Sequence, residues 1–156
     1  MNTWLQNKIV APLLGFLRQG TSPPRLALCV ALGIVIGNIP ILGVSSILCG
    51  LIALIFRLNL PAIQLVQAAM APSQVLLIIP FVRLGELLLR LPRQPISISA
   101  ALALMKQGVI PAVRGLWDAI LHAGFAWVLV APLLVWVLTR LLTGVFERAA
   151  SKLAST

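Results

Sequence analysis

Long runs of apolar residues, interrupted near the middle, dominate the chain. Between Arg25 and Arg57 lie 31 consecutive uncharged residues, but the segment Gly37–Gly43, rich in helix-breaking residues, divides them. The two flanks, Leu26–Asn38 and Val44–Phe56, have 13 residues each. This is about 20 Å of helix, whereas the hydrocarbon core of a bilayer is about 30 Å thick. We therefore expect a re-entrant hairpin as the first interpretation and a single broken helix as the second.

A second apolar run follows the same pattern. Residues Pro61–Val82 form a stretch of 22 uncharged residues, and Ala71-Pro72 and then Pro80 are expected to interrupt its helix. Two interrupted apolar segments in succession are typical of a transporter binding site, because opened helix ends offer N–H and carbonyl groups to a ligand. The two breaks are thus the first candidate site.

Small residues recur at helical spacing on both arms of the first run. Gly33 and Gly37 form a G-x-x-x-G face, and Ser46 and Gly50 form a similar face. Such faces allow helices to approach closely in a membrane. We expect the two arms to pack against each other through them.

The remaining segments complete a single all-α integral membrane domain over residues 1–156. We expect an interfacial helix at 1–21, the core with two broken segments at 22–93, and an interfacial linker at 94–114. A transmembrane helix at 115–140 and a polar tail at 141–156 follow. Its apolar part is Ala119–Thr139, and Trp117 and Trp136, about 28 Å apart on a helix, match two aromatic belts.

Composition agrees with a lipid environment. The chain is 60% hydrophobic and 10% charged, with a mean hydropathy of +1.07, whereas soluble domains are about 25% charged. The net charge of +9 would suit nucleic acid in a soluble protein. Here the cations flank apolar runs, so we expect anionic membrane lipids, and no nucleic acid, as the partner.

Few residues are available for catalysis. The chain has one histidine and three acids, and Asp118 and His122 are simply one turn apart on one helix. Cys29 and Cys49 lie in apolar runs and are expected to be packed thiols. We therefore expect no enzyme activity, no cofactor and no metal site.

Polar amides are the more informative side chains. Gln64, Gln67, Ala71 and Gln74 fall at spacings of three and four, which places the three amides on one helical stripe. They indicate either hydrogen bonds between helices or a water-filled path through the membrane.

Two arginines and an asparagine lie at the ends of the broken segments. Arg57 and Asn59 follow the first segment, and Arg83 follows the second. They are either interface anchors or, beside a cavity, cations that attract phosphate.

The order of these features resembles the bacterial membrane family catalogued as domain of unknown function 2062. The match runs from about Ser22 to Leu89 and comprises Ser22-Pro23, Ala27, Gly33, Gly37, Pro40, Gly43, Phe56-Arg57-Leu58-Asn59, Pro72, Pro80 and Gly85. Where the family usually has Asn-Pro, this chain has Ala71-Pro72, so any role of that asparagine is either lost here or moved elsewhere, with Gln74 as a candidate. The resemblance implies a bacterial membrane protein, and some relatives resemble fusions to glycosyltransferases. We expect a multi-pass protein of the inner membrane.

Two functions compete at this stage. The first is passage or flipping of an anionic lipid or polyprenyl phosphate; the second is a non-transporting scaffold for envelope assembly. The candidate ligand-binding residues are Asn38, Pro40, Gly43, Arg57, Asn59, Gln67, Pro72, Gln74 and Arg83. A homodimer is expected, because one chain has few helices with which to shield two breaks from lipid.

Overall fold

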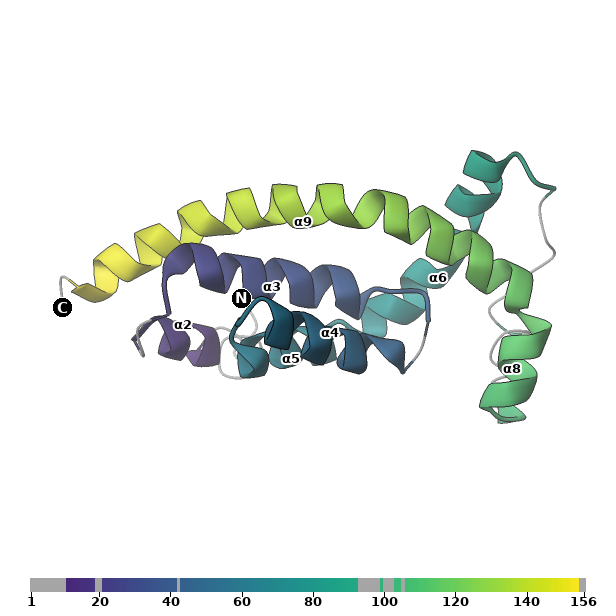
Figure 1. Cartoon of the computed structure of the whole chain (residues 1–156), viewed down its shortest axis with the longest axis horizontal. Helices are drawn as coiled ribbons and strands as arrows, with labels where there is room; N and C mark the ends of the chain where they lie inside the picture. The colour runs from purple at the N-terminus through teal and green to yellow at the C-terminus, as the bar shows by residue number, and fades with distance from the viewer. Residues whose placement is uncertain are drawn as a thin grey trace.

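The computed structural model describes residues 11–18, 21–41, 43–92, 99, 103–104 and 106–154. Within these ranges the chain is helical, with no strand. The helices are α2 (Ala11–Arg18), α3 (Pro23–Gly37), α4 (Val44–Ile55), α5 (Leu60–Ala69), α6 (Ala71–Leu89), α8 (Val109–Gly115) and α9 (Trp117–Ala154). Figure 1 shows α9 running along the whole length of the molecule, with α3, α4 and α5 beside its middle and C-terminal part.

The first apolar run folds as a helical hairpin. Helix α3 starts with two prolines in its first turn after the extended Ser22, and it ends at Asn38. Gly43 has a φ of 86°, a left-handed conformation that suits glycine, and α4 begins directly after it. Figure 1 shows α4 turned back beside α3. The predicted interruption is therefore a reversal of the chain.

The second apolar run does not reverse. Only Met70 separates α5 from α6, and its backbone is near-helical, with φ −83° and ψ −5°. Pro72 sits in the first turn of α6, where its missing N–H leaves no hydrogen bond unmade. Pro80 lies inside α6 without ending it. The expected break at Pro80 is thus wrong, and the break at Ala71-Pro72 is a joint between two helices.

The small-residue faces pack differently from the expectation. A Cβ on Gly33 would lie 2.8 Å from the Cβ of Val66, and one on Gly37 would lie 2.8 Å from the Cβ of Met70. Both glycines therefore bring α3 against α5 and the joint that follows it. Gly50 on α4 has no atom near its Cβ position. The prediction that the two hairpin arms meet through their small residues is wrong, because α5 occupies that face of α3.

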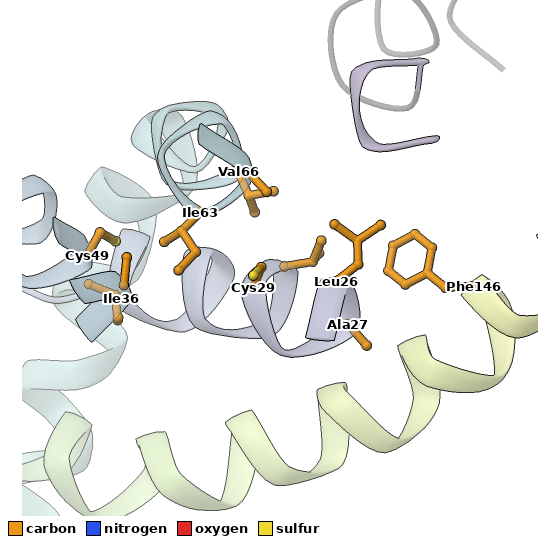
Figure 2. Close-up of a cluster of buried hydrophobic side chains, with 11 residues drawn as sticks. Leu26, Ala27, Cys29, Ile36, Cys49, Ile63, Val66 and Phe146 are labelled. Atoms are coloured by element: carbon orange, nitrogen blue, oxygen red, sulfur yellow. The ribbon is translucent and has the colours of Figure 1, made fainter. Parts of the chain in front are cut away.

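Helix α9 is longer than the transmembrane helix expected at 115–140. It has 38 residues and continues to Ala154, through most of the expected polar tail. Phe146 in this extension is buried at 8% exposure. Figure 2 shows it beside Leu26 and Ala27 of α3, at one end of a core that also contains Ile63 and Val66 of α5. The tail is helical because part of it belongs to the core.

Two helices are long and apolar enough to cross a membrane. They are Ala71–Leu89, of 19 residues, and Trp117–Lys152, of 36 residues. Only 22% and 17% of their most apolar windows are buried. A core helix of a soluble protein would be mostly buried, so these exposed apolar surfaces are consistent with an integral membrane protein.

The expected interfacial segments are described only in part. Within 1–21 the structure contains α2, whereas residues 1–10 and 19–20 lie outside the described ranges. Within 94–114 it contains α8 and isolated residues before it; residues 94–98, 100–102 and 105 lie outside.

Candidate functional site

The two breaks predicted from the sequence lie against each other. The Ser73 hydroxyl in the first turn of α6 donates to Oδ1 of Asn38, at 2.8 Å. Nε2 of Gln74 donates to the carbonyl of Ile39, also at 2.8 Å. Asn38 and Gln74 are 9% and 5% exposed. The tip of the α3–α4 hairpin is thus joined to the α5–α6 joint by buried polar contacts.

Two further amides join α4 to α5 near the same place. Gln67 donates to the Ser45 hydroxyl at 3.1 Å and accepts from the Ser46 hydroxyl at 3.2 Å. Gln64 donates to the Ser46 carbonyl at 3.0 Å. The predicted stripe of amides therefore makes hydrogen bonds between elements.

We call these side chains the tip network: Asn38, Ser45, Ser46, Gln64, Gln67, Ser73 and Gln74. The sequence pattern indicated the amides but not the serines as their hydrogen-bond partners. Their positions gave a signal, because Ser45 and Ser46 open the helix after Gly43, and Ser73 follows Pro72. Which helix each would meet depends on the packing.

Side chains donate hydrogen bonds to backbone carbonyl groups at the end of α3. The last carbonyls of a helix have no partner within it. Here Nδ2 of Asn38 donates to the Ile34 carbonyl at 2.7 Å, and the indole N–H of Trp127 on α9 donates to the Val35 carbonyl at 3.0 Å. Trp127 was also missed, although a tryptophan inside an apolar run needs a partner for its N–H.

Two helices begin at the tip network without a side-chain cap. Neither Gly43 before α4 nor Met70 before α6 offers a side-chain hydrogen bond to the first N–H groups of its helix. Helix N-termini carry a partial positive charge and attract anions. Pro40 is buried at the tip and, as a proline, adds no N–H that needs a partner.

Arg57 lies far from the tip, at the other end of α4. Thirteen residues separate it from Val44, or about 20 Å of helix. Its φ is 50°, in the left-handed region that normally favours glycine. The N–H of Leu58 donates to the Ala53 carbonyl at 2.9 Å, which closes a Schellman turn around this arginine. Its side chain is exposed.

Asn59 has a structural role at the start of α5. Its Oδ1 accepts from the N–H of Ala62 at 3.0 Å, so it caps the helix. As predicted, it lies beside Arg57, but its oxygen is already used by the backbone.

Arg83 lies on the opposite side of the tip network, about 15 Å along α6 from Ser73. Its Nη1 donates to Oε2 of Glu86 at 2.8 Å. The side chains are 37% and 3% exposed, respectively. The structure therefore gathers Asn38, Gln67 and Gln74 into one site and places the two predicted arginines at some distance on either side.

Four other potentially reactive side chains lie among the described residues: Cys29, Cys49, Asp118 and His122. Cys29 and Cys49 are free and fully buried, as expected for packed thiols. No group of three or more metal-ligating side chains occurs among the described residues. Asp118 is exposed in the first turn of α9, and Nδ1 of His122 is buried without a hydrogen-bond partner in the described part of the chain.

These features define an all-helical protein with two helices of membrane-spanning length and a polar site where a hairpin meets a helix joint. The chain belongs to the family described as uncharacterized proteins conserved in bacteria (DUF2062), whose model matches residues 4–152. The match extends well beyond the Ser22–Leu89 region that carried the resemblance in sequence. No curated protein and no solved structure matches the chain.

Proposed function

We propose that the protein is a multi-pass bacterial inner-membrane protein that passes the headgroup of an anionic lipid, such as a phospholipid or a polyprenyl phosphate, along α4, α5 and α6. The observation that carries the proposal is the tip network, a cluster of amides and hydroxyls at the meeting of two helix breaks. Around it, the exposed surface of α4 and α6 is strongly apolar, with Ile47, Leu54 and Leu76 each more than 60% exposed. Polar side chains in such surroundings mark ligand pathways in membrane proteins.

The proposed position of the protein in the bilayer is inferred from the apolar stretch of α9. Trp127 lies 8 residues from Ala119 and 12 from Thr139, so it is about 12 Å and 18 Å from the ends of the apolar stretch. Its bond to Val35 supports a position of the hairpin tip at middle depth in the proposed membrane. Phe146, which packs beside Leu26 at the base of the hairpin, is beyond that stretch. The hairpin is then re-entrant, and its base faces the headgroups.

The helix end at the tip supplies attraction for a headgroup. The N-terminus of α4 opens into the tip network after Gly43 without a side-chain cap. Its partial positive charge favours a phosphate at this depth, where the dielectric constant is low. The hydrogen bonds between Ser73 and Asn38 and between Gln74 and Ile39 are the contacts that close the path.

The arginines mark the two ends of the path. Arg57 stands at the base of the hairpin, and Arg83 lies beyond the tip on α6. The left-handed backbone at Arg57 would cost less with glycine. A non-glycine residue that keeps such a backbone is a candidate for a functional side chain.

The test uses substitutions at Arg57 in protein reconstituted into vesicles with fluorescent phosphatidylglycerol. Arg57→Lys keeps the charge and loses the planar fork of donors, so we expect transfer between leaflets to fall several-fold. Arg57→Gly should lower lipid transfer further. This variant should also unfold at a higher temperature, since glycine relieves the strain of the left-handed backbone by about 1 kcal/mol. Transfer is measured as the fluorescence that a membrane-impermeant reductant removes.

Arg148→Gln is the matched control, because Arg148 is an exposed arginine on the extension of α9 and not on α4, α5 or α6. It should change transfer only slightly, and salt should screen that change. If Arg57→Lys transfers the lipid as fast as the parent does, the headgroup path is wrong.

The second candidate is a rigid scaffold for envelope assembly. One observation favours it: every amide of the tip network already has a hydrogen-bond partner within the chain. Such a network stabilises a fixed shape as well as it gates a path. A parent protein that binds the vesicle lipids but transfers none of them would support the scaffold.

A further inference from the structure

The polar contacts between α4 and α5 reach the surface of the molecule. The bond from the Ser46 hydroxyl to Gln67 and the bond from Gln64 to the Ser46 carbonyl are both exposed. On the same helix as Ser46, Ile47 and Leu51 are 67% and 51% exposed. A group of amides and a hydroxyl is thus accessible on a surface that is otherwise apolar.

Gln64 has hydrogen-bonding capacity that the chain does not use. One of the two hydrogens on its Nε2 serves the Ser46 carbonyl. No donor among the described residues bonds to its Oε1. The side chain of Gln64 therefore offers one donor and one acceptor, and Oγ of Ser46, which donates to Gln67, can still accept. A ligand hydroxyl, which also donates and accepts, matches this arrangement.

Acidic side chains are missing from this part of the sequence. The chain has no aspartate or glutamate before Glu86, so α3, α4 and α5 carry none. Glu86 itself is 3% exposed, is bonded to Arg83, and lies about 20 Å along α6 from Ser73. An ammonium group at middle depth in a membrane would need an anion beside it, because a lone charge is costly where the dielectric constant is low. The path therefore suits phosphate and hydroxyl groups and not an ammonium.

We propose that Gln64, together with Ser46 and Gln67, selects lipids whose anionic headgroup carries free hydroxyls, such as glycerol or a sugar, and rejects headgroups that carry an ammonium. This inference rests on the lipid path proposed above and names the headgroups that the path admits. A headgroup hydroxyl accepts from the second N–H of Gln64 or donates to its Oε1. The phosphate is attracted by Arg57 at the base and by the N-terminus of α4 at the tip.

The test compares three lipids with the same fluorescent acyl chain in vesicles that contain the protein. Phosphatidylglycerol is anionic and has hydroxyls, phosphatidylmethanol has the same charge and none, and phosphatidylethanolamine carries an ammonium. We expect transfer of phosphatidylglycerol to be roughly three- to tenfold faster than that of phosphatidylmethanol, the effect of one net hydrogen bond. Phosphatidylethanolamine should be the slowest of the three.

Two glutamine substitutions assign the selection to its residue. Gln64→Leu removes the amide with little change in size, so the ratio of the phosphatidylglycerol rate to the phosphatidylmethanol rate should fall to about one. Gln107→Leu is the matched control, because Gln107 is exposed and lies outside α4, α5 and α6. It should keep the ratio of the parent. An unchanged ratio in Gln64→Leu, or the same fall in Gln107→Leu, overturns the role of Gln64.

Gln64→Glu tests the same site through a gain that a misfolded protein would not show. It places a carboxylate of nearly the same shape where the amide was, and at pH 8 an exposed carboxyl is ionised. Transfer of phosphatidylethanolamine should rise several-fold relative to phosphatidylglycerol, because the new anion pairs with the ammonium. An unchanged ratio of these two rates overturns the proposal.

The parent protein separates this inference from the function on which it rests. Equal rates for phosphatidylglycerol and phosphatidylmethanol overturn the selection of hydroxyls but leave the headgroup path. Transfer of none of the three lipids overturns both.

Discussion

At the scale of single residues, glycines decide how closely the helices approach. Gly85 lets α6 lie directly on the backbone of α9 at His122. Any side chain there would collide with a carbonyl group, which cannot move aside as the end of a flexible side chain can. Gly50 on α4 has the same sequence context of an apolar helix but open space around it. The sequence around Gly85 and Gly50 therefore does not show which of the two glycines lies at a close helix crossing.

We expect Gly85→Ala to destabilise the protein by about 1 to 3 kcal/mol, because the added methyl group forces α6 and α9 apart. Gly50→Ala should be neutral or stabilise the protein by up to about 1 kcal/mol, since alanine favours the helix. Thermal unfolding in detergent measures both. Equal unfolding temperatures for the two variants would contradict the close helix crossing.

At the scale of elements, α9 contacts the other helices along most of its length. Its first part crosses α6 near His122, its middle contacts α3 through Trp127, and its extension covers the base of the hairpin with Phe146. The cation of Arg140 lies 5.8 Å from the centroid of the Trp136 ring, where the apolar stretch ends. An aromatic ring and a cation at this position are typical of the membrane interface.

Two phenylalanines on α9 test the role of its extension. Phe146→Ala should lower the free energy of unfolding by about 3 kcal/mol, because it leaves a cavity in the core beside Leu26. Phe125→Ala removes the same ring from a position that is 43% exposed and should cost under about 1 kcal/mol. Denaturation in mixed micelles compares them. A Phe146→Ala protein as stable as Phe125→Ala would mean that residues 141–154 lie outside the folded core.

At the scale of the whole molecule, the proposed position in the bilayer determines which segments lie on the same side of the membrane. The hairpin enters and leaves the bilayer on one side. Helices α5 and α6 together cross the bilayer to the other side, and α9 crosses it back. Ser22 before α3 and Ser151 near the end of α9 then face the same side, whereas Gln107 faces the other. The homodimer expected from the sequence stays a prediction.

Single cysteines at these three exposed positions test the proposed position in the bilayer in a variant without Cys29 and Cys49. We expect a membrane-impermeant thiol reagent applied to sealed, oriented vesicles to label Ser22→Cys and Ser151→Cys together, and Gln107→Cys only after the vesicles are opened, or the reverse. Labelling of Gln107→Cys together with Ser151→Cys would contradict the crossing of α9.

Local chemistry was predictable from the chain. Gly37–Gly43 had to interrupt the first apolar run, because proline lacks an N–H and the glycines favour turns. The helical fold agrees with the long apolar runs, since within a membrane each backbone group would need a partner other than water. The packed thiols and the amide stripe were also predictable, since the apolar runs around the cysteines and the helical spacing of the amides are local features of the sequence.

Contacts between distant segments were decided by the tertiary structure. The sequence does not tell whether Gly33 and Gly37 meet α4 or α5, because both helices are apolar and of similar length. Pro80 looked like a break, but α6 continues through it. The partners of Asn38, Gln74 and Glu86 likewise depend on where three helices cross. Helix formation is set by neighbours along the chain, whereas the pairing of polar groups is set by packing among segments up to 92 residues apart, as Trp127 and Val35 are.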